Sequence, residues 1–287
     1  MREPARNIAA SVRAKLLNLS RERGQPYELL LTRYALERLL YRLSMTGYRD
    51  RFVLKGAVLV STWFDAPFRP TRDLDLLGFG DDEPASILEA FREICALQVD
   101  DGIQFDVAGL VIDSIRDEAE YGGLRLKTYA NIATAKVRVT VDIGFGDAVE
   151  PGIAELELPG LLDLPPPRIR AYPREAVIAE KFQAMVVLGR TNSRMKDFYD
   201  VWLLSRVYEF DGESLARAIA ATFARRKTSI PETAPDALTA AFAADPAKRQ
   251  QWASFLQAID AAPIALADVV GELAEFLMGH ANAARRM

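Results

Sequence analysis

The chain has 287 residues, half of them hydrophobic, with 36 Lys and Arg against 40 Asp and Glu and a formal net charge of −4. This length allows one large or two ordinary domains, and the acidic balance argues against a basic nucleic-acid coat over the whole surface while leaving room for a local basic groove. The single cysteine, Cys95, excludes an intramolecular disulfide, and the single histidine, His280, argues against histidine triads and Cys/His zinc sites.

The N-terminal residues and the hydropathy bear on location. Residues 1–13 carry charges throughout and lack the apolar stretch of a secretory signal. No run of apolar residues approaches the roughly 18 that a membrane span needs. We therefore expect a cytoplasmic protein that has no membrane partner.

Hydrophobic periodicity predicts two N-terminal helices, over about 4–23 and 27–45, separated by Gly24 and Pro26. Short strands and helices then alternate. We expect strands over 52–54, 73–79, 104–112, 124–132 and 135–145, helices over 57–64 and 84–97, and a proline-punctuated loop over 65–70. The last three strands follow one another without intervening helices, which favours antiparallel pairing.

Composition changes after Asp147, where residues 151–170 become rich in Pro and Leu. The remainder has helical periodicity, over about 174–189, 196–209, 211–225, 233–244, 247–260 and 264–280. We therefore predict N-terminal helices over 1–50, an α/β core over 51–150, a Pro-rich connector over 151–173 and a helical domain over 174–287. The predicted fold class is α+β, with a mixed β-sheet domain flanked by helices and a mainly helical C-terminal domain.

A pair of acids in the predicted strand over 73–79 is the strongest chemical signal. Asp73 and Asp75 are two residues apart, so a strand places them on one face. Two carboxylates this close repel unless water or a divalent cation lies between them, and Mg²⁺ is usually held by one or two carboxylates plus substrate phosphates. Arg72 beside them can offset their charge or bind a phosphate. The alternative is a strand end with two solvated acids.

A third acid is expected from a strand further along the chain. Asp142 lies between Val141 and Ile143, where a carboxylate calls for a partner or a metal. Asp106 is a rival in a similar setting. Asp147 lies in the following loop, where a turn or cap role is expected.

The turn after the first strand suits an anion. Gly56 and Ala57 open a predicted helix, whose backbone N–H groups can approach a phosphate, and Lys55 precedes them. Alternatively, Gly56 serves only the turn and Lys55 is solvated. Ala57 lacks the hydroxyl of a serine, so a backbone contact is the one expected there.

Cations recur in the predicted helical domain. Lys181 shares a helix face with Val177 and Ala184, and a later helix start is crowded by charges: Arg194, Lys196, Asp197 and Asp200. These residues suit phosphate binding, with an acid orienting a nucleotide base or one of the cations. The alternative is a helix start stabilised by ion pairs. The runs 225–227 and 248–249 are either a local basic edge or a solvated face.

Together these stretches resemble the AbiEii/AbiGii family of nucleotidyltransferase toxins, from type IV toxin–antitoxin systems, within the polymerase-β-type superfamily. The resemblance covers roughly residues 30–210 and rests on 54–57, 71–75, 141–144, 179–181 and 194–200. It implies a catalytic set of Asp73, Asp75, Asp142 and Lys181, with the three acids on Mg²⁺. It also implies nucleotide binding by Lys55, Gly56, Ala57, Arg72, Lys181, Arg194, Lys196, Asp197 and Asp200.

The resemblance further implies transfer of a nucleoside monophosphate from an NTP to an acceptor hydroxyl. In some family members the acceptor is the 3′ end of tRNA, so growth is arrested. A cognate antitoxin is the implied protein partner. Three alternatives stay open: a small-molecule acceptor, a protein acceptor, and a catalytically inactive module that binds nucleotide or antitoxin.

Overall fold

A computed structural model describes residues 7–64, 71–115 and 122–287. The chain divides into two compact units. One, here called the sheet unit, comprises Met1–Gly146 and Glu155–Ala171; the other, the helical unit, comprises Asp147–Ala154 and Tyr172–Met287. Each is described by itself below. Among the described residues, no helix combines the length and apolar character that a bilayer crossing requires.

Two helices open the sheet unit, as predicted. Helix α1 (Ile8–Arg23) ends where Gly24 adopts a left-handed φ of 63°, and α2 (Tyr27–Ser44) follows after Pro26. Helix α2 is buried along most of its length because it packs against both β6 and β8 of the sheet, and it also contacts α4 (Pro84–Ala96). The many apolar residues of α2 are therefore explained by its position in the core.

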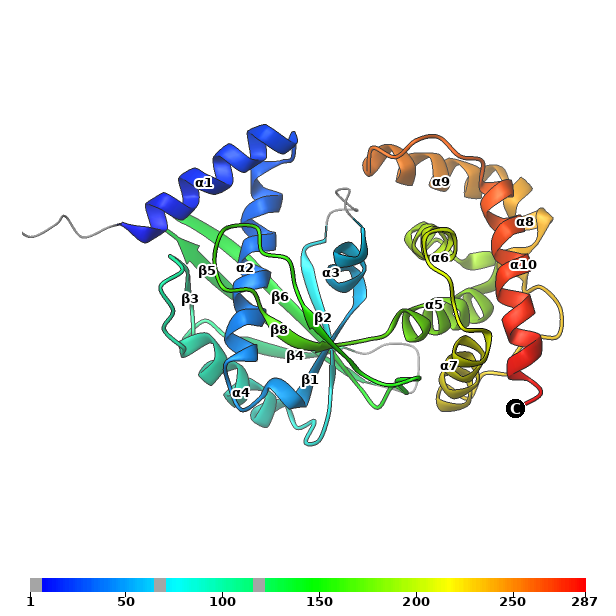
Figure 1. The fold of residues 1–287 in the computed structure, drawn as a ribbon, viewed down its shortest axis with the longest axis horizontal. Helices are drawn as coiled ribbons and strands as arrows, with labels where there is room; N and C mark the ends of the chain where they lie inside the picture. The colour runs from blue at the N-terminus through cyan, green and yellow to red at the C-terminus, as the bar shows by residue number, and fades with distance from the viewer. Residues whose placement is uncertain (1–6, 65–70, 116–121) are drawn as a thin grey trace, which may run out of the picture. The chain divides into compact units, whose positions relative to one another are not determined.

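The sheet is mixed, with the strand order β3-β5-β6-β2-β1-β8-β7, and β4 pairs beside β5 (Figure 1). The strands are β1 (Phe52–Lys55), β2 (Asp73–Gly78), β3 (Gln104–Phe105), β4 (Val111–Ile115), β5 (Gly123–Ile132), β6 (Ala135–Phe145), β7 (Ala154–Glu157) and β8 (Arg168–Ala171). The predicted antiparallel run is confirmed, since β4, β5 and β6 pair antiparallel. The central strand β2 pairs antiparallel with β1 and parallel with β6.

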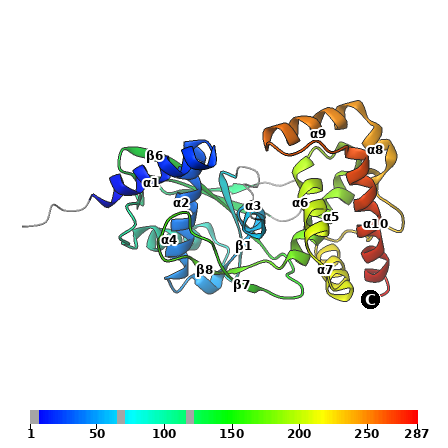
Figure 2. The same ribbon diagram turned by 45° about the horizontal axis from the view of Figure 1, so that its top comes forward.

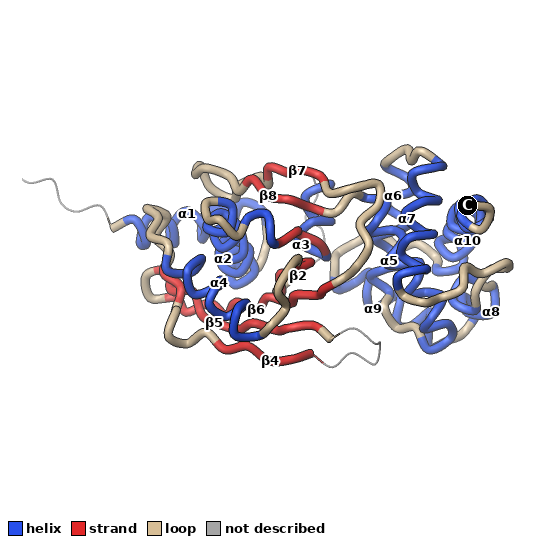
Figure 3. The backbone as a smooth tube through the Cα atoms, turned by 90° about the horizontal axis from the view of Figure 1, so that it is seen from below, coloured by secondary structure: helices blue, strands red, loops and turns tan. Residues whose placement is uncertain are grey.

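Side chains alternate between the two faces of the sheet, so one face is apolar and the other is polar except at the buried pair Val53 and Leu77. Buried residues of the apolar face occupy matching positions on four strands: Leu54, Leu74, Leu76, Leu124, Leu126, Val139, Val141 and Ile143. Helices α1, α2 and α4 lie on one side of β4, β5 and β6 (Figure 3) and supply the other half of this core. The polar face is therefore the one that can carry chemistry.

Two of the strands and helices predicted for the sheet unit differ from the structure. The strand expected over 104–112 is two strands, β3 and β4, because the Asp106 carboxylate accepts a hydrogen bond from the Gly109 N–H and turns the chain between them. The helix over 57–64 is α3 (Gly56–Val60) followed by a 3-10 turn over Ser61–Trp63. The loop over 65–70 lies outside the described residues.

The stretch 151–173, expected as a connector, contributes β7 and β8 to the sheet. Leu54 of β1 pairs in parallel with Ala171 of β8, and the Leu158 N–H donates to the Pro167 carbonyl. Proline interrupts helices but is compatible with strand ends at a sheet edge, so a Pro-rich composition does not by itself exclude strands.

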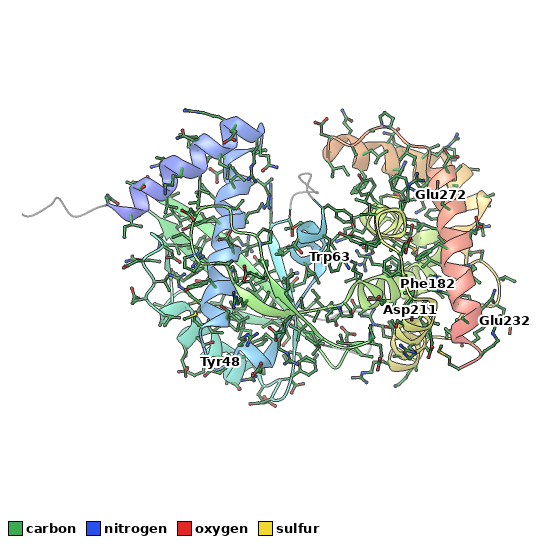
Figure 4. All side chains as sticks on the ribbon, in the orientation of Figure 1. Tyr48, Trp63, Phe182, Asp211, Glu232 and Glu272 are labelled. Carbon is green, nitrogen blue, oxygen red and sulfur yellow. The ribbon has the colours of Figure 1, made fainter. Side chains whose placement is uncertain are left out.

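The helical unit contains α5 (Arg174–Leu188), α6 (Met195–Val207), α7 (Gly212–Arg225), α8 (Ala240–Ala244), α9 (Pro246–Ala258) and α10 (Leu266–Ala284) (Figure 2). The helix expected over 233–244 is a 3-10 turn and the short α8. Phe182 of α5 is fully buried and packs on Phe223 of α7 (Figure 4). Glu272 of α10 accepts a hydrogen bond from the Trp202 indole, which ties α10 to α6. The predicted fold class is confirmed.

A buried ion cluster in the sheet unit was not anticipated from the sequence. Arg38 and Arg42 lie one turn apart on α2, and both donate to the Asp101 carboxylate at 2.7–3.1 Å. All three side chains are almost fully buried. Arg38 also donates to the Pro165 carbonyl, so the cluster holds two loops on α2. The signal was present as two arginines four residues apart in a leucine-rich helix.

Candidate active site

Four charged residues form a row across neighbouring strands on the polar face of the sheet. The register pairs Lys55 of β1 with Asp75 of β2, Asp75 with Asp142 of β6, and Asp142 with Arg125 of β5. The strands can be followed in Figure 1. Paired residues in neighbouring strands point to the same face, so these four side chains lie side by side. In order they are a cation, two acids and a second cation. We refer to these four residues as the charged row.

Asp73 lies beside the row, on the same face of β2 as Asp75. It is exposed and pairs in register with Thr140, whereas Asp75 is partly buried. The shared face expected for the two acids is therefore what the strand provides. Arg72, just before β2, is exposed. Within the described residues, no group of three or more Asp, Glu, His or Cys side chains is arranged as it stands to hold a metal ion.

Gly56 determines where the Asp75 carboxylate can lie. Its φ is +70°, and a Cβ added there would overlap the Asp75 carboxyl and stand 2.6 Å from its Cβ. Gly56 thus serves both a left-handed turn and a close approach that a larger residue would prevent. Ala57 is buried, so its side chain packs and only its backbone faces the turn. The donor set suits Mg²⁺, because two carboxylates without competing nitrogen ligands is the arrangement that ion usually accepts.

Arg125 holds Asp142 by two parallel hydrogen bonds, from Nε to Oδ1 at 2.7 Å and from Nη2 to Oδ2 at 2.6 Å. This is the bidentate geometry in which guanidinium–carboxylate pairs are strongest. The hydrogen bond to Asp142 raises the pKa of Arg125 despite the opposing effect of burial, and the charges of Asp142, Asp73 and Asp75 add to the increase. The guanidinium therefore lies in the field of all three carboxylates.

The rival acid Asp106 and the loop acid Asp147 have other partners. Asp106 follows β3, which pairs with the far end of β5 at Asn131 and Ala130, and its carboxylate caps a turn at Gly109. Asp147 belongs to the helical unit, where it accepts hydrogen bonds from Arg226 rather than capping a turn. The register therefore places Asp142, and neither Asp106 nor Asp147, beside Asp75.

In the helical unit, Lys181 of α5 lies between two buried acids of α6. Its Nζ is 2.6 Å from Asp197 Oδ1 and 2.8 Å from Asp200 Oδ2, and Arg194 Nε is 2.6 Å from Asp197 Oδ2. Both aspartates are fully buried, whereas the Arg194 side chain is 47% exposed. These ion pairs agree with the alternative of a helix start stabilised by ion pairs, and phosphate binding by Lys181, Arg194 or Lys196 stays a prediction.

The pKa values of this cluster follow from its charges. Burial alone would lower the pKa of Lys181, but the carboxylates of Asp197 and Asp200 outweigh it and the pKa is raised. Burial alone would raise the pKa of Asp197, yet Lys181 and Arg194 lower it below its ordinary value. Both groups are therefore charged at neutral pH, and the lysine is not a proton donor there.

Exposed cations lie beside this cluster. Lys196 is exposed in the first turn of α6, and the Lys248 ammonium donates to the Asn192 carbonyl in the loop before that helix. The run 225–227 is not simply a solvated face, because Arg226 is ion-paired with Asp147 and Glu180. Arg194 and Lys196 at the start of α6 and Arg249 of α9 face solvent, and so do Arg225 and Lys227 of the other run.

Arg125 is the residue of the charged row that sequence reasoning missed. It stands in the predicted strand over 124–132, and an arginine in an alternating strand normally indicates a solvated position. Only the pairing register of β5 with β6 brings it opposite Asp142. A charge count along the paired strands would have identified it once that register was known.

The first of two similar solved structures shows the fold. The crystal structure of JHP933 from Helicobacter pylori has a TM-score of 0.52 at 15% identity and covers 91% of this chain and 95% of its own. A candidate nucleotidyltransferase from H. pylori has a TM-score of 0.48 at 16% identity, with coverage of 87% and 92%. No protein with a curated description matches the chain. The model of the family described as "Nucleotidyl transferase AbiEii toxin, Type IV TA system" matches residues 38–272 and confirms the resemblance inferred from the motifs. The chain, matched over most of its length, therefore belongs to the AbiEii family of nucleotidyl transferase toxins.

Proposed function

We propose that the protein is a Mg²⁺-dependent nucleotidyltransferase that moves a nucleoside monophosphate from an NTP to an acceptor hydroxyl, and that RNA, at the 3′ end of tRNA, is the acceptor. Family membership supplies the coarser statement, a nucleotidyltransferase toxin with an antitoxin partner. The charged row is the observation that supports metal-dependent transfer, because it gathers Asp75 and Asp142 beside Asp73 on the polar face.

In this proposal Asp73, Asp75 and Asp142 hold the metal. Bound Mg²⁺ would supply positive charge against the transferring phosphoryl group. Because Gly56 has no side chain, the Asp75 carboxyl can lie against the backbone of the turn, where the proposed metal and the nucleotide phosphates would meet. Lys55 and Arg72 are the cations of the sheet unit that would contact the nucleotide phosphates, and Asp142 would accept the proton of the acceptor hydroxyl.

For the helical unit we propose phosphate binding by Arg194 and Lys196, which are the exposed cations at the start of α6. Lys181 is held by Asp197 and Asp200, so its role in binding the nucleotide would be to fix the orientation of these acids and, through Asp197, of Arg194. Bidentate donors such as Arg194 match phosphate geometry. An action on tRNA in the cytoplasm would arrest growth until the antitoxin counteracts it.

The test is to incubate the purified protein with Mg²⁺, each α-labelled NTP in turn, and total tRNA, total protein or a small-molecule fraction. We expect label in tRNA. Asp75→Asn should reduce transfer on the order of 100-fold or more, since it removes a metal ligand while keeping the side-chain shape. Asp106→Asn is the matched control, because its amide oxygen can still accept from the Gly109 N–H.

The alternatives predict different results. Label in protein or in a small molecule would replace the RNA acceptor. NTP binding without transfer to any acceptor would identify a catalytically inactive module. Full activity of Asp75→Asn would show that the charged row is not the active site.

A further inference from the structure

Asp142 is the one acid of the proposed metal site that comes from β6 rather than β2. Arg125 forms hydrogen bonds with both of its carboxylate oxygens. Nε and Nη2 each take a different oxygen of Asp142, at 2.7 and 2.6 Å. A carboxylate engaged at both oxygens by a cation has its charge offset by that cation, and one of the two lone pairs of each oxygen is directed at the guanidinium. Asp142 is therefore not a free third ligand in this conformation.

We propose that Arg125 is a built-in competitor of the divalent cation for Asp142, so that metal binding to the charged row requires the Arg125–Asp142 pair to open. The inference rests on the proposed function only in that it takes the metal to bind at Asp73, Asp75 and Asp142.

Electrostatics require this competition. Mg²⁺ binds carboxylate oxygens at about 2.0–2.1 Å, so a metal on Asp142 would stand next to a guanidinium already within hydrogen-bond distance of the same group. Two cations on one carboxylate repel each other strongly at that separation. Without a metal, in contrast, the arginine offsets the repulsion among three neighbouring acids. The same residue therefore stabilises the metal-free state and opposes the loaded one.

The arginine is also placed to move. Its side chain is 42% exposed, and that of Asp142 is 22% exposed, so the pair can open into solvent without disturbing the apolar face of the sheet. Its backbone is held by the antiparallel pairing of β5 with β6, so only the side chain needs to change. Asp142 would then be released without any change of register.

Lys127 provides a matched control on the same strand. It lies two residues after Arg125, hence on the same face, and forms a comparable ion pair with Asp113 of β4 at 2.7 Å. Asp113 belongs to β4, on the side of β5 away from β6, and it pairs in register with Arg125. Removing the charge of Lys127 changes the net charge of the protein by the same amount as removing that of Arg125.

The experiment measures Mn²⁺ affinity by titration calorimetry and by the EPR signal of free Mn²⁺, on the full chain without nucleotide. We expect Arg125→Gln to bind Mn²⁺ about tenfold more tightly than wild type, which is the size of one charge-assisted hydrogen bond. Arg125→Lys, which keeps the charge but loses the bidentate geometry, should show a smaller gain. Lys127→Gln should match wild type, and Asp75→Asn should bind more weakly.

The possible results distinguish the proposed metal site from the proposed competition by Arg125. Loss of affinity in Asp75→Asn with no gain in Arg125→Gln overturns the competition and leaves the metal site standing. Unchanged affinity in Asp75→Asn, or no Mn²⁺ binding by any variant, overturns the metal site and the competition together. An equal gain in Mn²⁺ affinity in Lys127→Gln would mean that net charge alone causes the effect, and it would also overturn the competition. Should Arg125→Gln not fold, as judged by circular dichroism, the comparison of Arg125→Lys with wild type decides.

Discussion

Gly56 and Asp75 are in such close contact that the carboxyl of the second occupies the space where a side chain of the first would begin. Gly56 also has a φ of +70°. We predict that Gly56→Ala is destabilised by about 1–2 kcal/mol through its backbone conformation alone. It should also displace the Asp75 carboxyl, so nucleotidyl transfer should fall by more than the loss of folded protein explains. Urea unfolding and the transfer assay check the two parts separately.

Gly24 separates these two effects. It ends α1 with a φ of +63°, and a Cβ there meets nothing within 4 Å. Gly24→Ala therefore carries the same kind of backbone cost without a steric one. We expect a similar loss of stability in Gly24→Ala but full activity of its folded fraction. Equal activity in the two variants would mean that the contact with Asp75 is not needed for the chemistry.

The second prediction concerns the cluster of Arg38, Arg42 and Asp101. Asp101→Asn would leave two buried guanidinium groups without the carboxylate that both now contact. Removing one partner from a buried ion cluster typically costs about 3–5 kcal/mol. We expect a loss of that size in urea unfolding followed by far-UV circular dichroism. Asp113→Asn, which breaks the exposed pair with Lys127, should cost at most about 1 kcal/mol. Similar losses of stability in Asp101→Asn and Asp113→Asn would show that burial of the ion cluster does not determine its contribution.

Local periodicity was sufficient for the elements of the sheet that alternate without interruption. The strands expected over 124–132 and 135–145 are β5 and β6 to within one residue. The strand expected over 104–112 was wrong because Asp106 and Gly109 make a turn inside it, and a side-chain cap of this kind leaves little trace in hydropathy. The parallel pairing of β8 with β1 joins segments more than a hundred residues apart, and no local pattern records it.

In the candidate site, too, some features follow from local sequence patterns and others depend on long-range pairing. That Asp73 and Asp75 share a face follows from the two-residue period of a strand alone. That Asp142 rather than Asp106 lies beside Asp75 depends on which residues pair between β2 and β6, and this register is set by packing of the whole apolar face. The same dependence hid Arg125, whose partner is identified only by the register between β5 and β6.

The third prediction concerns Lys181, which balances two fully buried acids. Lys181→Met keeps the length of the side chain but leaves Asp197 and Asp200 close together without the ammonium. We expect the helical unit to lose about 3–5 kcal/mol of stability. Two of the three tryptophans, Trp202 and Trp252, belong to this unit. Their fluorescence in a Trp63→Phe background therefore follows its unfolding in urea. A loss below 1 kcal/mol would mean that Arg194 alone neutralises both acids.

The last prediction is the pH dependence of that cluster. The pKa of Asp197 is lower in the folded protein than the ordinary 3.8 because Lys181 and Arg194 outweigh the effect of burial. Its stabilising contribution is thus fully present above pH 3.8 and is lost as the pH falls through the folded-state pKa. The pKa of Lys181 is raised above 10.5, so its contribution is present below that pH and is lost only as the pH rises through the folded-state value.

We therefore expect the difference in stability between wild type and Asp197→Asn to be constant from about pH 5 to 9 and to shrink below about pH 4, where the Asp197 carboxyl of the unfolded wild-type chain becomes protonated before that of the folded protein. Urea unfolding of both proteins, followed by tryptophan fluorescence at several pH values, measures this difference directly. The Asn variant is the control for every other carboxyl that titrates in the same range, since those groups remain in both proteins. A difference that stays constant down to pH 3 would require that Asp197 keeps its proton equilibrium unchanged on folding, and so would contradict the ion pairs with Lys181 and Arg194.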